Sequence, residues 1–209
     1  MLQSRSRWVV VGVAFSVLTF VGFNIALPSA KARGSGSGNL YFATSADDQF
    51  LRGRIASLGP DVAAEEAQRV TRCAYQTGRE LKKEWGVVWP PGLMNLLVNT
   101  GARKGGLCFH FATELLHRLD ALKLETLDLH WAESYERTVS EHNVIVVTAK
   151  GQPFQQGILL DNWRYGGRLI WGPLNGDAEY EWKENKTEFA RRLKMRYNDL
   201  SGPTPAPGR

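Results

Sequence analysis

Apolar residues in the first half of the folded region recur at helical spacing. Between Asp61 and Trp85 they return every three or four residues, with glutamates near the start and lysines near the end, so a helix capped by Asp61 is expected. Residues 47–57 and 93–98 show the same spacing over shorter lengths and predict two short helices. A further helix is expected from residue 108 to 119–121. Its apolar face contains Cys108, Ala112, Leu115 and Leu119.

The second half of the chain changes to the two-residue alternation of β-strands. This alternation begins at residues 127–131 and is followed by a polar stretch, 132–141, that predicts a loop. Residues 142–149 are rich in β-branched side chains, and a Gly-Gln-Pro turn separates them from the apolar run 154–161. These two runs therefore predict an antiparallel hairpin.

Shorter elements follow the hairpin. The Gly-containing stretch 164–167 predicts a turn, and residues 168–171 and 180–182 predict two further strands. Residues 187–197 show helical spacing and predict a terminal helix. Helices followed by an antiparallel sheet predict the α+β fold class.

Residues 1–32 have the features of a secretory leader. Two arginines precede a nearly continuous apolar run of about 20 residues, and Ala30-Lys31-Ala32 has the small-x-small pattern of a cleavage site. A run of this length also spans a bilayer if it stays uncleaved, so a signal peptide and an N-terminal membrane anchor are both open. Either alternative predicts an exported protein, periplasmic or anchored to the outer face of the inner membrane, with membrane contact only through this segment.

The rest of the chain divides by composition. The Gly/Ser-rich segment 33–46 predicts a flexible linker, residues 47–200 a single folded domain, and the Pro/Gly-rich segment 201–209 a disordered tail. Three of the 26 basic side chains lie within residues 1–32, where no acidic side chain occurs. The remainder carries 23 basic and 21 acidic side chains, a net charge of +2 without a basic cluster, which argues against a nucleic-acid partner.

Three residues suited to acyl transfer occur in a suggestive order. Cys108 begins a predicted helix, whose N-terminal dipole favours the nucleophilic thiolate. His142 begins one hairpin strand and Asp161 ends the other, so their side chains are expected to be neighbours. If the side chains of each strand alternate strictly between its two faces, His142 lies on the same face as Val144, and Asp161 on the same face as Leu159. Packing of the Cys108 helix on that face would bring the three candidate residues together. Cys108 is then the nucleophile, His142 the base and Asp161 the residue that orients the imidazole.

Each of these residues also has a structural interpretation. Free cysteines are often inert core residues, a histidine at a strand end is often exposed, and an Asp-Asn pair is favoured in turns. The two cysteines, Cys73 and Cys108, could also form a disulfide bond in an oxidising compartment, which would exclude nucleophilic catalysis. For oxyanion stabilisation, Asn95 is the candidate side-chain amide, beside the backbone N–H of Cys108.

No cofactor or metal site is expected. His110 and His117 lie seven residues apart on the predicted helix, and no third ligand follows at a recognisable spacing. The sequence therefore offers residues for covalent acyl chemistry and none in a known metal-binding pattern.

Short motifs around the three candidates resemble a known family. Gly106-Leu107-Cys108, the run from His142 to Val147, and Leu159-Leu160-Asp161-Asn162 resemble the transglutaminase-like branch of the papain-like superfamily, and are similar to the bacterial transglutaminase-like cysteine proteinases. The resemblance covers about a third of the chain. It implies a nucleophile helix packed on an antiparallel sheet, and amide hydrolysis through a thioester by Cys108, His142 and Asp161. Phe109-His110 replace the acidic residues that follow the cysteine in the calcium-associated members, so calcium dependence is not implied.

Three hypotheses follow. The first is an exported cysteine hydrolase, a peptidase or amidase, that acts on a protein or peptide substrate. The second is a catalytically inactive transglutaminase-like module used for binding or assembly in the cell envelope. The third is a small structural domain cross-linked by Cys73 and Cys108. The oligomeric state and the substrate are not indicated by the sequence.

Overall fold

The computed structural model describes residues 41–42, 48–138 and 140–195. The predicted leader and tail lie outside these residues, as does most of the predicted linker. Among the residues described, none of the helices combines the length and apolar character needed to cross a bilayer.

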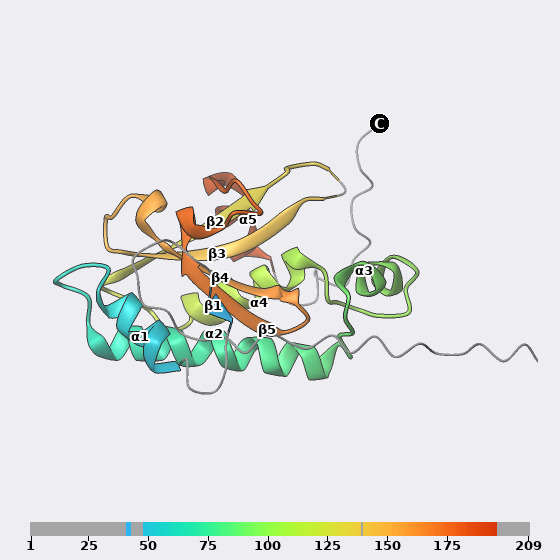
Figure 1. The fold of residues 1–209 in the computed structure, drawn as a ribbon, viewed down its shortest axis with the longest axis horizontal. Coiled ribbons are helices and arrows are strands. Elements are labelled where there is room, and N and C mark those ends of the chain that lie inside the picture. The colour runs from blue at the N-terminus through green and yellow to red at the C-terminus, as the bar shows by residue number, and fades with distance from the viewer. Residues whose placement is uncertain (1–40, 43–47, 139, 196–209) are drawn as a thin grey trace, which may run out of the picture. The chain divides into compact units, whose positions relative to one another are not determined.

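Five helices occur in the described part of the chain. The first four precede most of the sheet, and α5 follows it (Figure 1). Their bounds are α1 Asp48–Ala56, α2 Ala64–Glu84, α3 Pro91–Asn99, α4 Cys108–Asp120 and α5 Lys186–Lys194. The helices expected from the apolar spacing are therefore all present, with ends shifted by a few residues.

The strands form one six-stranded sheet in the order β1-β5-β4-β3-β2-β6, and every neighbouring pair is antiparallel. Two short 3-10 turns, η1 Phe154–Gln156 and η2 Leu174–Gly176, join strands. The strands are β1 Tyr41–Phe42, β2 Leu127–Ser134, β3 His142–Ala149, β4 Ile158–Tyr165, β5 Arg168–Pro173 and β6 Lys183–Glu184. The expected α+β class is confirmed.

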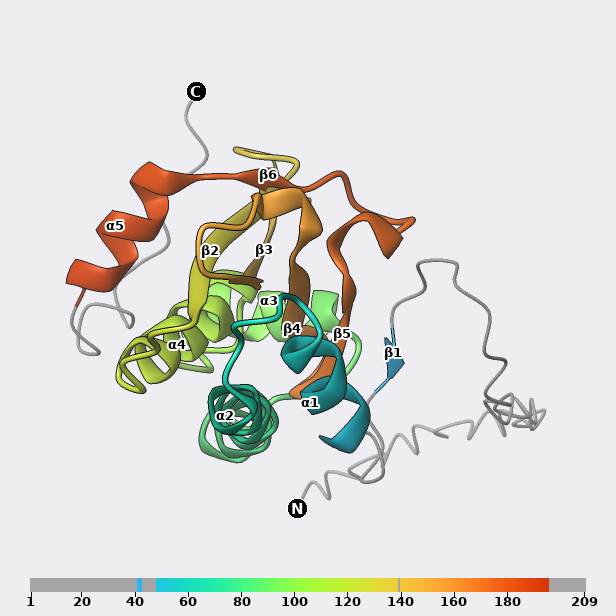
Figure 2. The same cartoon turned by 90° about the vertical axis from the view of Figure 1, so that its left-hand side faces the viewer.

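The main core lies between the helices and one face of the sheet. Figure 2 shows α2 and α4 on the same side of the strands. Leu115 and Leu119 of α4 pack there with Ile145 and Val147 of β3 and with Leu160 of β4. A smaller cluster covers the opposite face. It consists of Ala132, Val144, Val146, Phe154, Leu159 and Leu174.

The N-terminus of α2 differs from the prediction that Asp61 caps it. The helix begins at Ala64, and its N-cap, Ala63, donates its backbone N–H to Thr126 Oγ1 over 3.1 Å. The Glu66 carboxylate in the first turn accepts backbone hydrogen bonds from Glu125, at 2.7 Å, and from Thr126, at 3.0 Å. Contacts with the loop before β2 therefore take the place of a local side-chain cap.

Several strand limits also differ. β2 continues to Ser134, into the predicted loop 132–141, because it pairs with β3 along its whole length. The predicted strand 154–161 begins as η1, and β4 runs from Ile158 through the predicted turn 164–167 as far as Tyr165.

The strand predicted at 180–182 is instead at Lys183–Glu184, and α5 spans 186–194 rather than 187–197. Tyr41–Phe42, within the predicted linker 33–46, pair with β5 and belong to the sheet. The segments near both ends of the domain thus owe their structure to pairing with distant strands.

Candidate active site

Cys108 is the first residue of α4, and two glycines set its position. Gly106 has a φ angle of +121°, a backbone conformation that residues other than glycine rarely adopt. A Cβ atom on Gly105 would lie 2.7 Å from the Trp85 ring, so the chain passes too close to this indole for a larger residue. The backbone N–H of Leu107 donates to Nδ1 of His110 over 3.2 Å. These contacts fix the start of the helix, where the N–H groups of the first turn have no intrahelical partner.

The Cys108 side chain is 9% exposed and lies at the start of β3. Its thiol lies 3.5 Å from the carbonyl oxygen of Glu141, in hydrogen-bonding geometry, and Nδ2 of Asn143 approaches the sulfur to 3.7 Å. Cys108 and Cys73 are both free thiols. The hypothesis of a domain cross-linked by these two cysteines is therefore wrong, because Cys108 faces the end of the sheet rather than α2.

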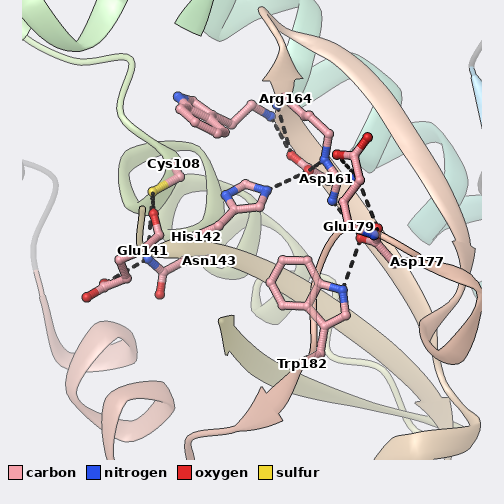
Figure 3. Close-up of polar contacts among 10 residues, drawn as sticks. Cys108, Glu141, His142, Asn143, Asp161, Arg164, Asp177, Glu179 and Trp182 are labelled. Carbon is pink, nitrogen blue, oxygen red and sulfur yellow. Dashed lines mark hydrogen bonds and ion pairs between the residues drawn. The ribbon is translucent and has the colours of Figure 1, made fainter. Parts of the chain in front are cut away.

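His142 and Asp161 are hydrogen-bonded neighbours, as the hairpin geometry predicted. Nε2 of His142 lies 2.8 Å from Oδ2 of Asp161, and both side chains are 1% exposed. Figure 3 shows the imidazole between the Cys108 thiol and the Asp161 carboxylate. A carboxylate only accepts hydrogen bonds, so Nε2 carries the proton and, in the neutral ring, Nδ1 is left with a free lone pair. Nδ1 has no partner in hydrogen-bonding geometry among the described residues.

The expectation that α4 packs on the face of His142 is wrong. The helix packs on the opposite face, beside Ile145, while Val144 belongs to the second cluster. Cys108 still meets His142 because the first turn of α4 lies at the end of β3, where the thiol contacts both Glu141 and Asn143. An end-on approach of the helix, rather than face packing, brings the three residues together.

The environment of His142 favours the imidazolium. Burial on its own lowers the pKa of His142, but the charge of Asp161, the hydrogen bond to it and the nearby Cys108 raise the pKa to about 9. Burial alone raises the pKa of Asp161, whereas His142, Arg164 and the backbone N–H of Trp163 bring it down to about 2. The pair is consequently an ion pair at neutral pH.

The Asp161 carboxylate is saturated by hydrogen bonds. Besides His142, its Oδ2 accepts from Nε of Arg164 at 3.1 Å, and its Oδ1 accepts from the backbone N–H groups of Trp163, at 2.8 Å, and Arg164, at 3.2 Å. These contacts need the irregular pairing between β4 and β5 at residues 161–165. Asp161 is therefore held in one orientation from which it fixes the imidazole.

Arg164 extends this network to a second buried acid. Its Nη2 lies 2.7 Å from Oδ2 of Asp177, which also accepts from Nε1 of Trp182 at 3.1 Å. Neither Arg164 nor Asp177 was identified from the sequence as a site residue. Arg164 follows Asp161 closely in a run that reads as a turn, and the loop that carries Asp177 has no periodic pattern.

Aromatic rings enclose His142 on the side of this network. The ring centroids of Trp163, Tyr180 and Trp182 lie 4.8, 4.9 and 5.3 Å from that of the imidazole. Tyr180 and Trp182 stack on each other, and the Arg164 guanidinium lies over the Tyr180 ring. The alternation of Tyr180 and Trp182, which predicted a strand, instead covers the imidazole.

The predicted oxyanion residue, Asn95, is not part of the hydrogen-bonded group around His142. Asn95 is on α3, and no hydrogen bond among the described residues joins it to Cys108, His142 or Asp161; its Oδ1 is buried without a partner there. Its oxyanion role stays a prediction. Within the described ranges, no group of three or more His, Cys, Asp or Glu side chains could hold a metal ion.

No protein-family model matches the chain, and no significant match was found among curated proteins or solved structures. The chemistry of the site is therefore argued from its own geometry.

Proposed function

We propose that this protein is a cysteine hydrolase that cleaves amide bonds in a protein or peptide, with Cys108 as nucleophile, His142 as base and acid, and Asp161 as the orienting carboxylate. The observation that carries the proposal is the hydrogen bond from His142 Nε2 to Asp161 at 2.8 Å, on a ring whose other nitrogen has no partner in hydrogen-bonding geometry and whose pKa Cys108 helps to raise. This arrangement of nucleophile, base and orienting group is that of nucleophilic catalysis.

The proposed reaction passes through a thioester. In the reactive form, Cys108 is a thiolate and its proton is held on Nδ1 of the His142 imidazolium. The thiolate attacks the carbonyl carbon, whose π electrons move onto oxygen. When the carbonyl re-forms, the C–N bond breaks and the amine leaves with the proton of the imidazolium. A water molecule that loses its proton to His142 then attacks the thioester, and the carboxylic acid and the free thiol result.

The papain-like, transglutaminase-like arrangement belongs to the same proposal. It is supported by the order of the three residues along the chain and by a nucleophile at the start of a helix that packs on an antiparallel sheet. The leader expected over residues 1–32 supports an exported location, in the periplasm or at the outer face of the inner membrane.

The burial of the site favours a second candidate. The His142 side chain is buried, and three aromatic rings surround it. A catalytically silent binding or assembly module in the cell envelope would keep such a closed site. The two candidates differ in whether Cys108 reacts with a substrate-like electrophile in the folded state.

Covalent trapping tests this difference. The full chain is incubated at neutral pH with a peptidyl vinyl sulfone, and the adduct is mapped by mass spectrometry. We expect one adduct on Cys108 and none on Cys73, a half-buried thiol whose pKa is raised by burial and which serves as an internal control. Cys108→Ser should remove the adduct. A folded wild-type protein that gives no adduct at Cys108 would favour the silent module.

A further inference from the structure

The residue after His142 also reaches the nucleophile. Successive side chains of a strand point to opposite faces, so His142 and Asn143 diverge from β3. Nδ2 of Asn143 lies 3.7 Å from Cys108 Sγ and 3.1 Å from Oε1 of Glu141. Figure 3 shows the Asn143 amide directed at Cys108 and Glu141, while the His142 ring is directed at Asp161. The first two residues of β3 thus approach the thiol with two different chemical groups.

The orientation of the Asn143 amide is fixed by Trp131. The indole Nε1 of Trp131 donates to Oδ1 of Asn143 over 3.0 Å. An indole N–H can only donate, so the amide oxygen must face Trp131 and the amide NH₂ must face Cys108 and Glu141. Trp131 is 0% exposed and Asn143 is 3% exposed, so the reversed amide would leave a buried donor facing a donor.

One N–H of this amide has only a weak acceptor. Of the two protons on Nδ2, one is directed to the Glu141 carboxylate, and the other meets the Cys108 sulfur at 3.7 Å, where a thiol accepts poorly. When a carbonyl carbon is bonded to Sγ, its oxygen lies one bond further from the sulfur. A buried N–H donor 3.7 Å from the sulfur is therefore suited to stabilise the negative charge that develops on this oxygen during the reaction.

We propose that Asn143 is a catalytic residue that donates its Nδ2–H to the oxyanion formed at Cys108. This inference rests on the hydrolase function proposed above. As the S–C bond forms, the electron pair of the C=O π bond moves to oxygen, and Asn143 together with the backbone N–H of Cys108 binds this oxyanion. On collapse the pair returns, the C–N bond breaks, and the donors release a neutral thioester carbonyl.

Two reactions of the same sulfur separate this role from a structural one. Alkylation by iodoacetamide displaces iodide at a saturated carbon and forms no oxyanion, whereas acylation by p-nitrophenyl acetate passes through a tetrahedral oxyanion. Both rates are measured at neutral pH on the full chain carrying Cys73→Ser, in which Cys108 is the sole remaining thiol of the two in the sequence. Asn143→Ala should slow acylation by ~10²–10³-fold and change alkylation by less than about threefold.

A second pair of variants protects the test against loss of folding. Asn143→Leu keeps the approximate volume of the side chain and removes the donor without placing a charge beside the thiolate, so it should lose acylation in the same selective way. Trp131→Phe removes the indole N–H that orients the amide, together with part of a buried ring, and should slow acylation less than Asn143→Ala. Circular dichroism checks that each variant is folded.

The remaining outcomes overturn the inference. Equal slowing of both reactions in a folded Asn143 variant would show that Asn143 only keeps the Cys108 thiol in position. Unchanged acylation would show that Asn143 does not donate to the oxyanion. His142→Gln tests the parent proposal independently. If the wild-type Cys108 is not acylated and its alkylation is indifferent to His142→Gln, the hydrolase function fails, and the role of Asn143 fails with it.

Discussion

Nε2 of His142 and Oδ2 of Asp161 lie 2.8 Å apart in a site from which solvent is almost completely excluded. The pair joins the ends of two adjacent strands, and its charges are balanced by Arg164 and Asp177. Its electrostatics therefore contribute to both the folding and the proposed chemistry of the protein.

The raised pKa of His142 predicts a stability that depends on pH. A histidine whose folded pKa lies above its unfolded value stabilises the fold fully below the unfolded pKa, 6.5, and loses that contribution as the pH rises through about 9. We expect the free energy of unfolding to fall between pH 6.5 and about 9.5 by on the order of 3 kcal/mol from this group. Urea denaturation at several pH values measures the change, and subtraction of the His142→Gln profile isolates it from other titrating groups. Parallel profiles for the two proteins would contradict the prediction.

The lowered pKa of Asp161 has the opposite sign. Its contribution is present above the unfolded pKa of 3.8 and disappears as the pH falls through about 2. We expect Asp161→Asn to flatten the acid side of the stability profile over that window, as measured by the same denaturation series. If the free energy of unfolding of Asp161→Asn falls at low pH as steeply as that of the wild type, other carboxyl groups control acid unfolding.

Removal of Arg164 should take away the guanidinium shared by two buried carboxylates, of which Asp161 keeps its ion pair with His142. The Arg164 side chain is 9% exposed, and those of Asp161 and Asp177 are each 1% exposed. We expect Arg164→Gln to lower the free energy of unfolding by about 3–5 kcal/mol, measured by urea denaturation. The matched control is Arg137→Gln, which breaks a surface pair with Glu136 and should cost about 0–1 kcal/mol. Similar costs for the two variants would refute a structural role for the buried network.

Gly106 should be required for the position of the thiol. A Cβ atom there would lie 2.4 Å from the terminal methyl of Met94, which can move, but the φ angle of +121° remains unfavourable for alanine. We expect Gly106→Ala to cost about 1–3 kcal/mol and to slow the reaction of Cys108 with vinyl sulfone. Gly53→Ala in α1 has open space and no such φ angle, so the same change there should be neutral or slightly stabilising. Equal thermal midpoints for the two variants would exclude this role.

The elements that were predicted correctly are those determined by the pattern of neighbouring residues in the sequence. β3 was predicted with its observed limits because a β-branched run ends at a clear Gly-Gln-Pro turn, and the meeting of His142 with Asp161 followed from hairpin geometry. The helix that begins at Cys108 followed from its apolar spacing after two glycines.

The errors arose where distant contacts decide the structure. β3 is apolar on both faces, so periodicity did not indicate which face α4 covers. β4 continues into the predicted turn 164–167 as far as Tyr165, which pairs with Arg168 of β5, and Arg164 binds Asp177, thirteen residues further along. The orientation of the Asn143 amide depends on Trp131 in the neighbouring strand, a contact that no local pattern predicts.

The most direct test of the central claim is the dependence of Cys108 reactivity on His142. Second-order rate constants for iodoacetamide are measured at pH 7 for Cys108 and Cys73 separately, by peptide mass spectrometry, in the wild type and in His142→Gln. We predict that Cys108 reacts faster than Cys73 in the wild type, and that the variant lowers the Cys108 rate by about tenfold or more while Cys73 is unaffected, because only the thiolate attacks. A Cys108 rate that is no greater than that of Cys73, or that is unchanged in folded His142→Gln, would contradict the account.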